Sequence, residues 1–362
     1  MVEFDFEMLS SLGLTPALAH RAASLPMPEG VGVNLLRVTE VHRESVRLHD
    51  SGSERSARPL PRLVRALSED GTALAVGDWV LAADDEHRQT WVQERVPPSS
   101  HIARRDGDGR RHPVVSNVDT ALLVMGLDDD FNPRRLERYL ALVHGDAIVP
   151  VVVLTKQDVA APTADALDAR LDALRGRIPG HVDVMAVNAT HPSAAESLRC
   201  YLARGQTLVL LGSSGAGKST LTNTLLGAVV QDTGTVREHD SRGKHTTTSR
   251  SLHRVPGGAC VIDTPGLRTL RPDVDEATLA GSFADVVALA GQCRFRDCQH
   301  ANEPGCAVRD GVAADRLRNY HKLLREARRD TLTALDRQKQ PAEWKVRGRA
   351  TRERIKVKRG EG

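Results

Sequence analysis

Aromatic residues and long apolar runs are scarce in this chain. Phe, Trp and Tyr make up only 3% of its 362 residues, so its cores must consist mainly of Val, Leu and Ala. No apolar run approaches the ~20 residues of a membrane-spanning helix. The acidic N-terminus lacks the basic flank and the apolar stretch of a signal peptide. We therefore expect a cytoplasmic protein with no membrane partner.

Cysteine is also rare, and the count of five is odd, which argues against a framework of disulfides. Cys200 and Cys260 stand alone in segments with an apolar pattern, and we expect both in a core. The length suggests two or three domains. No feature of the sequence demands an oligomer, so we expect a monomer.

The net charge of +3 conceals an uneven distribution of charge. Residues 316–362 hold 16 Lys/Arg and 6 Asp/Glu, whereas residues 1–315 hold more acids than bases. A basic tail on an acidic body favours an anionic polymer as partner, and nucleic acid is the first candidate. A solvated helix that contacts nothing would have the same composition.

Residues 33–97 alternate apolar and polar side chains between Ser-Gly, Asp-Gly and Gly-Asp turns. This pattern predicts about five short antiparallel strands, for which an OB-fold barrel is the natural candidate. Such barrels often bind single-stranded nucleic acid through aromatic and basic side chains. Trp79 and Trp91 are available for this, although we expect them in the core or at the rim. Residues 1–32 form a helix-prone N-terminal extension, and residues 98–116 read as a polar, arginine-rich linker.

Residues 117–270 contain near-continuous apolar runs, and a helix-compatible segment follows each of the first four. Buried strands that alternate with helices predict a doubly wound parallel sheet. The motif GSSGAGKST comes directly after one of these strands and opens a helix, the context in which a phosphate-binding loop is credible. Its backbone N–H groups would hold phosphate, Lys218 would reach the β- and γ-phosphates as a catalytic residue, and Ser219 would bind Mg²⁺. The predicted loop comprises Gly212, Ser213, Ser214, Gly215, Ala216, Gly217, Lys218, Ser219 and Thr220.

The segment TKQD ends another strand at the carboxyl edge of the predicted sheet, where such sheets bind ligands. It consists of Thr155, Lys156, Gln157 and Asp158. A carboxylate at Asp158 can accept hydrogen bonds from both N1–H and the exocyclic amine of guanine, and adenine offers neither pattern. The stem of Lys156 can cover the base plane. Together with the phosphate-binding loop, TKQD therefore favours GTP over ATP.

The segment DTPG supplies the next two candidates. Asp263 ends a strand and would hold Mg²⁺ through water, and the N–H of Gly266 would contact the γ-phosphate. Between the phosphate-binding loop and DTPG, the stretch 243–249 has few apolar residues and should be mobile without ligand. A threonine hydroxyl there, which we assign to Thr247, could complete the Mg²⁺ shell as in the switch of GTPases.

The order of these motifs is unusual, because the guanine motif precedes the phosphate-binding loop. The same sheet can form if its chain has been cut and rejoined, with a helix from about Ser193 to Gly205 as the join. The strand before DTPG would then lead straight into the C-terminal region. From this order alone, nucleotide state is expected to move the C-terminal module directly.

The motifs in this order resemble the circularly permuted bacterial GTPases of the RsgA family. The resemblance covers about residues 33–330 and includes GDWV in the barrel, NVD at 117–119, TKQD, GSSGAGKST, GKHTTT, DTPG and a cysteine cluster with EPGCAV. It implies a nucleic-acid-binding barrel, a permuted GTPase and a zinc-containing C-terminal domain. It further implies that GTP hydrolysis to GDP is stimulated by the small (30S) ribosomal subunit during late maturation, with 16S rRNA as the partner.

The resemblance also bears on catalysis. Many GTPases carry a catalytic Gln directly after the DxxG glycine, but here Leu267 stands at that position and cannot orient a water molecule. The resemblance assigns this role to His245 of GKHTTT, although contact of His245 with rRNA or solvent alone remains the alternative. The loop that usually backs the guanine reads VNAT at 187–190. Because Leu267 cannot orient the attacking water, slow intrinsic turnover of GTP is expected.

The remaining cysteines form a cluster with a histidine, in the pattern Cys293-x4-Cys298-x-His300-x5-Cys306. Three thiolates and one imidazole suffice for a closed tetrahedral zinc site, which would hold one ion per chain and have a structural role. Reduced free cysteines beside a surface histidine are the alternative. The cluster lies in a predicted helical zinc-binding domain of residues 271–330, which a basic tail of residues 331–362 follows.

The sequence thus predicts a multidomain α/β protein with an N-terminal OB-fold barrel, a central permuted GTPase and a C-terminal helical zinc-binding domain. Two other functions stay open on the sequence alone. One is a nucleotide-gated RNA-binding scaffold in which hydrolysis is incidental. The other is an ATP-dependent phosphotransferase, against which TKQD argues.

Overall fold

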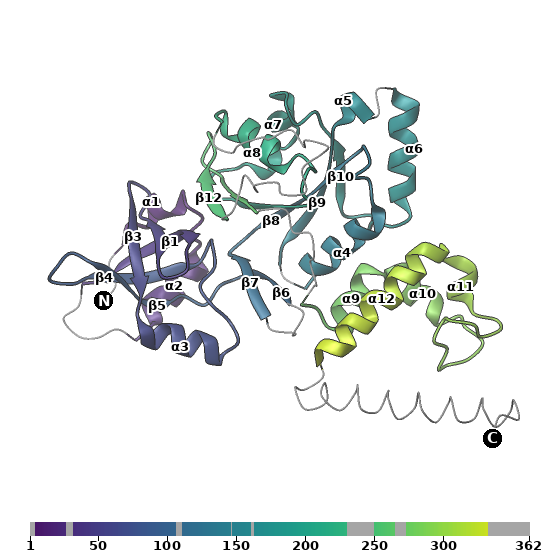
Figure 1. The fold of residues 1–362 in the computed structure, drawn as a ribbon, viewed down its shortest axis with the longest axis horizontal. Coiled ribbons are helices and arrows are strands. Elements are labelled where there is room, and N and C mark those ends of the chain that lie inside the picture. The colour runs from purple at the N-terminus through teal and green to yellow at the C-terminus, as the bar shows by residue number, and fades with distance from the viewer. Residues whose placement is uncertain are drawn as a thin grey trace, which may run out of the picture.

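The computed structural model describes residues 4–26, 32–105, 111–145, 147–160, 163–229, 250–264 and 273–331. Two short helices, α1 (Phe6–Ser10) and α2 (Pro16–Ser24), begin the chain as the sequence predicts. A barrel, a sheet covered by helices and a helical unit follow (Figure 1). No helix in these ranges is long and apolar enough to span a membrane.

Five strands close into the predicted barrel. β1 pairs with both β2 and β4, and β3 runs parallel to β5, so the order β1-β2-β3-β5-β4 returns to β1. The helix α3 (Pro61–Glu69) connects β3 to β4, an arrangement that fits an OB-fold. Trp79 is fully buried, and Trp91 lies at the rim, where its indole donates to Asp85. The strands are β1 (Asn34–Val41), β2 (Val46–His49), β3 (Glu54–Pro59), β4 (Trp79–Asp84) and β5 (Thr90–Arg95).

The central sheet has the order β10-β9-β8-β11-β13-β12. Every neighbouring pair is parallel except β12 and β13. The apolar runs make these strands because both faces of the sheet are covered, and their alternate side chains pack into two separate cores. The strands are β8 (Thr120–Gly126), β9 (Val149–Thr155), β10 (Asp183–Ala186), β11 (Thr207–Leu211), β12 (Ser251–Arg254) and β13 (Cys260–Asp263).

Helices cover both faces of this sheet. α4 (Pro133–Val143) and α6 (Ala164–Arg175) pack on one face, and α7 (Ser193–Ser197) and α8 (Lys218–Leu226) pack on the other. The expected helix at 193–205 is interrupted, because α7 gives way to the 3₁₀ turn η1 (Arg199–Tyr201). This turn leaves Cys200 exposed, so its predicted core position is wrong, whereas Cys260 is buried as predicted.

The residues between barrel and sheet form a hairpin, although the sequence reads as a polar linker. Its strands are β6 (His101–Arg105) and β7 (Arg111–Ser116), which pair antiparallel. Arginine and histidine at the outward positions conceal the alternation that would have predicted strands. A second connection is direct, because β12 pairs with β1 at Ser251 and Glu40 and joins barrel and sheet into one eleven-stranded sheet.

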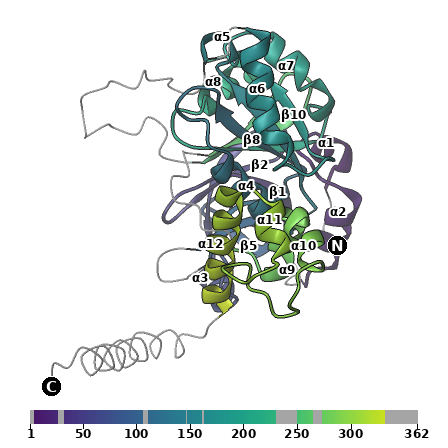
Figure 2. The same ribbon diagram turned by 90° about the vertical axis from the view of Figure 1, so that its right-hand side faces the viewer.

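The described C-terminal helices surround a small core of their own. They are α9 (Glu276–Ser282), α10 (Ala284–Ala290), α11 (Ala307–Gly311) and α12 (Ala314–Thr331). The last of them lies against α4 in both views (Figures 1 and 2). Buried Arg316 binds Glu137 of α4 at 2.9 Å and Asp285 of α10 at 2.7 Å. Ion pairs therefore fix this unit to α4, in addition to its covalent connection through residues 265–272.

A fully buried arginine, Arg37 of β1, joins the barrel, the N-terminal helices and the central sheet. Its guanidinium lies 5.6 Å from the centroid of the Trp79 ring. Burial lowers the pKa of Arg37, an effect that the nearby Cys260, Asp119 and Asp78 oppose. It donates hydrogen bonds to Leu12 O, Gly77 O, Asn117 O and Thr207 Oγ1.

We expect Arg37→Met to destabilise the protein strongly, because it leaves three carbonyl groups and one hydroxyl buried without their donor. At about 1–3 kcal/mol for each orphaned group, the loss should exceed ~3 kcal/mol. Urea unfolding followed by circular dichroism measures it. Arg47→Met, at an exposed position of β2, is the control and should change stability by less than ~0.5 kcal/mol. Equal midpoints for the two variants would contradict the role of Arg37.

Candidate nucleotide and metal sites

The predicted phosphate-binding loop connects the end of β11 to the start of α8. Gly215 and Gly217 have φ angles of +82° and +91°, which residues other than glycine rarely adopt. A Cβ atom at Gly212 would lie 2.4 Å from the carbonyl oxygen of Val124. Glycine is therefore required at all three positions, and the loop has the tight turns that a backbone phosphate cradle needs.

Lys218 opens α8 with its side chain folded against the loop. It is 6% exposed, and its Nζ donates to the carbonyl oxygen of Ser213 at 2.7 Å. Burial lowers its pKa, which the negative charges of Asp263 and Asp130 counteract. The ammonium group thus stays at the loop in the absence of a ligand.

Asp263 lies on the neighbouring strand, opposite Leu210 of β11 in the parallel register. It is 1% exposed, and neither carboxylate oxygen accepts a hydrogen bond of good geometry within the described chain, although the N–H of Thr264 and the hydroxyl of Ser219 lie close enough to lower its pKa slightly. Burial raises its pKa to about 6, against the opposing charge of Lys218. A buried carboxylate with so few good donors is unfavourable unless positive charge lies near it, and Lys218 supplies part of that charge. The structure therefore offers a cation position beside the loop.

The guanine motif TKQD meets the phosphate-binding loop directly. Thr155 is the last residue of β9, and its Oγ1 donates to the carbonyl oxygen of Ala216 at 2.6 Å. Lys156 adopts a φ of +62°, and its Nζ forms an ion pair with Asp128 at 2.6 Å. Asp158 lies exposed on the short helix α5 (Gln157–Ala160). Two motifs 61 residues apart in sequence are thus in contact.

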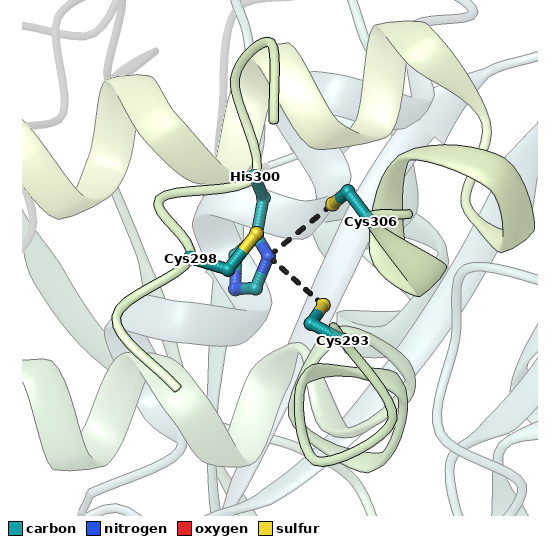
Figure 3. Close-up of side chains that lie close together, drawn as sticks. All are labelled: Cys293, Cys298, His300 and Cys306. Atoms are coloured by element: carbon teal, nitrogen blue, oxygen red, sulfur yellow. Dashed lines mark hydrogen bonds between the residues drawn. The ribbon is translucent and has the colours of Figure 1, made fainter. Parts of the chain in front are cut away.

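The Cys₃His cluster lies between α10 and α11. Potential ligand atoms of Cys293, Cys298, His300 and Cys306 all lie within 4.8 Å of one another. The Nδ1 atom of His300 is 3.6 Å from Cys293 Sγ and 3.5 Å from Cys306 Sγ, and the four side chains converge (Figure 3). Cys306 is buried in the core of the helical unit. The residues that the sequence singled out can therefore hold one metal ion.

Comparison with known proteins places the chain in a family of GTPases. Residues 95–272 match the family model described as RsgA GTPase. A protein of Xanthomonas oryzae pv. oryzae (strain MAFF 311018) named "Small ribosomal subunit biogenesis GTPase RsgA" is 47% identical over 295 residues, which are 79% of each chain. A relative of the same name from Xanthomonas campestris pv. campestris (strain B100) has the same identity and coverage. The chain belongs to the RsgA GTPase family.

Solved structures support the permuted fold of this RsgA-family chain. The crystal structure of YjeQ from Thermotoga maritima has a TM-score of 0.57 and 23% identity, and the match covers 82% of this chain and 98% of that one. YloQ, described as a circularly permuted GTPase, has a TM-score of 0.54 and 21% identity, with 85% and 100% covered. The fold class predicted from the sequence is confirmed.

An acidic loop after β8 belongs to the site of this RsgA-family chain, although the sequence reasoning missed it. Asp130 accepts hydrogen bonds from Ser213 Oγ at 2.5 Å and from the Gly126 amide at 3.0 Å. Asp128 holds Lys156, as described above. The signal was available, since three consecutive aspartates follow a buried strand at the edge where the two motifs also lie.

Several sites predicted for this RsgA-family chain fall outside the described residues. These are His245, Thr247, Gly266 and Leu267. The VNAT loop is described, and Thr224 of α8 donates to the carbonyl oxygen of Ala189 at 2.6 Å. This contact ties the VNAT loop to the helix that the phosphate-binding loop opens.

The raised pKa of Asp263 predicts a pH dependence of stability in the nucleotide-free protein. In the folded state the pKa of Asp263 is about 6, whereas in the unfolded chain it is ~3.9. Between these two pH values the folded protein therefore binds a proton that the unfolded chain has lost. Ionised Asp263 therefore costs stability above pH 6, and the cost disappears as the pH falls towards 4. Asp263→Asn should stabilise the protein at pH 7.5 by up to ~3 kcal/mol.

Urea unfolding of both proteins between pH 7.5 and pH 4.5 measures this difference, which should shrink steadily as the pH falls. Asp165→Asn on α6, where the side chain is exposed, should show no such trend. A constant difference between Asp263→Asn and the unmodified protein at every pH would show that Asp263 does not titrate as expected.

Proposed function

We propose that this chain is a Mg²⁺-dependent hydrolase that cleaves GTP to GDP and phosphate during maturation of the small ribosomal subunit. The observation that carries the proposal is the hydrogen bond from Thr155 to Ala216, since it joins a guanine motif to a phosphate-binding loop. Curated relatives at 47% identity bear the name of a small ribosomal subunit biogenesis GTPase.

The nucleotide would lie along the contact between the two motifs. Asp158 would accept hydrogen bonds from guanine, and Lys156, held by Asp128, would cover the base. Thr155 and Gln157 complete the base-binding segment. The phosphates would lie in the loop from Gly212 to Thr220, and the γ-phosphate would also contact the N–H of Gly266.

Mg²⁺ would supply positive charge that neutralises the β- and γ-phosphates when it is bound. Ser219 and Thr247 are its proposed direct ligands. The buried carboxylate of Asp263, which accepts no hydrogen bond of good geometry, fits a position beside the ion, with water between them. Lys218 holds a second positive charge at the phosphates. For the attacking water we propose His245, because Leu267 has no group that could orient it.

Zinc is the ion that we assign to the Cys₃His cluster. At a tetrahedral centre, bond lengths of ~2.05 Å to nitrogen and ~2.3 Å to sulfur place nitrogen and sulfur about 3.6 Å apart. The two measured separations from His300 Nδ1 are 3.6 and 3.5 Å. One ion in this position would brace the long connection between α10 and α11, which has few apolar contacts of its own.

The RNA partner would be 16S rRNA, contacted by the OB-fold barrel and the basic C-terminal region. We propose that the protein acts as a cytoplasmic monomer. Its proposed domains are the barrel of residues 33–97, the permuted GTPase of residues 117–270 and the zinc-binding unit of residues 271–330. The extension 1–32, the segment 98–116 and the tail 331–362 accompany them.

GTP and ATP turnover, measured with and without purified small ribosomal subunits, tests base choice, enzyme class and partner together. We expect slow hydrolysis of GTP by the protein alone, a large increase when subunits are added, and little hydrolysis of ATP. Asp158→Asn should weaken GTP binding by at least ~10-fold, because the lost acceptor leaves guanine donors unpaired. Asp165→Asn is the matched control and should bind GTP normally.

Equal rates with and without subunits would refute the ribosomal part of the proposal. Preference for ATP would refute the assignment of the guanine motif and favour a phosphotransferase. A His245→Ala protein that hydrolyses little GTP yet supports normal subunit maturation would favour an RNA-binding scaffold instead.

Elemental analysis of the purified protein tests the zinc assignment. We expect about one zinc ion per chain, and Cys298→Ser should reduce this content to a small fraction, because it removes one of four ligands. Cys200→Ser removes an exposed cysteine outside the cluster and should leave the content unchanged. Full zinc occupancy in Cys298→Ser, or none in the unmodified protein, would show that the cluster holds reduced cysteines.

A further inference from the structure

Glu303 holds the backbone on both sides of His300, one of the four residues of the metal cluster. Its Oε1 atom accepts a hydrogen bond from the N–H of Gln299 at 3.0 Å, and its Oε2 atom accepts one from the N–H of Ala301 at 2.8 Å. The two donors directly precede and follow His300. A single carboxylate therefore spans the backbone around this residue.

The conformation of His300 explains why it needs such support. Its φ angle is +58°, in the left-handed region that is uncommon for residues other than glycine. Without contacts that fix it, a histidine favours a negative φ, and its side chain then leaves the backbone in a different direction. The hydrogen bonds to Glu303 restrain this conformation, because the nitrogen of Ala301 is one of the four atoms that define the ψ angle of His300.

Two of the other ligands are held by helices. Cys306 directly precedes α11, and its Sγ accepts a hydrogen bond from the N–H of Arg309 at 3.3 Å. The N–H of Cys293 donates to the carbonyl oxygen of Ala290, the last residue of α10, at 3.2 Å. His300 lies in the connection between these helices (Figure 3). Its position therefore depends on contacts made within that connection.

The contribution of Glu303 is geometric rather than electrostatic. Three thiolates carry more negative charge than one Zn²⁺ ion neutralises, so the centre gains nothing from a further carboxylate charge. Glu303 also lies outside the group of four residues whose potential ligand atoms converge. Both of its oxygens accept hydrogen bonds from the loop backbone instead.

We propose that Glu303 is a positioning residue of the metal centre, which holds His300 as the fourth ligand and thereby slows the release of the ion. The proposal rests on the proposed function, which makes zinc the ion. Groups outside the ligand shell that orient a ligand typically change metal affinity by about 10–100-fold. Glu303 would act in this way through the backbone, by keeping His300 Nδ1 at 3.6 and 3.5 Å from two of the cysteine sulfurs.

The test uses the full chain with Glu303→Ala and, as the matched control, Asp297→Ala. The control removes the same charge from an exposed position of the same loop. Each protein is loaded with zinc, and the transfer of zinc to an excess of a chromogenic chelator is followed with time. Glu303→Ala should release zinc at least ~10-fold faster than the unmodified protein, and Asp297→Ala should match the unmodified protein. Glu303→Gln, which keeps one acceptor oxygen, should fall between them.

A second readout separates positioning of His300 from a general loosening of the loop. Co²⁺ can replace Zn²⁺ at thiolate and imidazole sites, and its visible absorption depends on its ligands. The spectrum of cobalt-loaded Glu303→Ala should shift towards that of His300→Ala, whereas Asp297→Ala should keep the spectrum of the unmodified protein. Adding Glu303→Ala to His300→Ala should change zinc release by less than about twofold, because the ligand that Glu303 positions is already absent.

Equal rates of zinc release from Glu303→Ala and the unmodified protein would overturn the inference and leave the zinc assignment standing. Equal acceleration in Glu303→Ala and Asp297→Ala would also overturn it, because the effect would then belong to charge alone. An undiminished effect of Glu303→Ala in the His300→Ala protein would show that Glu303 does not act through His300. An unmodified protein that holds no zinc would refute both the inference and the zinc assignment.

Discussion

The parallel alignment of β9, β11 and β13 is the constraint on which the nucleotide site depends. Parallel strands place their carboxyl ends at one edge, so the residues that follow each strand are brought together whatever their order along the chain. Thr155 ends β9, the glycine-rich loop follows β11, and Asp263 ends β13. The inverted order of the motifs therefore changes the connections of the sheet but leaves its edge intact.

Much of the candidate site can be proposed from the sequence because each motif is local. The phosphate-binding loop, TKQD and the Cys₃His cluster each carry their ligand atoms within a few residues, so spacing alone indicates their chemistry. The run of three aspartates after β8 marks that loop in the sequence, but the separate roles of Asp128 and Asp130 depend on contacts with Lys156 and Ser213, which follow other strands. The pattern of residues within one segment cannot display such contacts.

The fold was predictable where hydrophobic periodicity dominates and failed where polar residues carry the structure. The barrel and the parallel sheet follow from apolar patterns, whereas the hairpin β6–β7 has arginine and histidine at its outward positions, so its sequence is typical of a linker. Arg37 is a second polar residue whose position the sequence does not predict. Its charge suggests exposure, and its burial depends on acceptors from four distant positions.

The position of the C-terminal unit decides how a change of nucleotide could reach the parts that we propose to bind RNA. Chain order alone suggests that the unit moves with the segment after Asp263, but buried Arg316 ties it to Glu137 of α4. Removing one member of a buried ion pair typically costs ~3–5 kcal/mol, so this contact would resist separation. By contrast, β12 touches both the strand that carries Asp263 and the barrel strand β1. A change at the nucleotide would therefore reach the barrel through β12 more directly than it would displace the C-terminal helices.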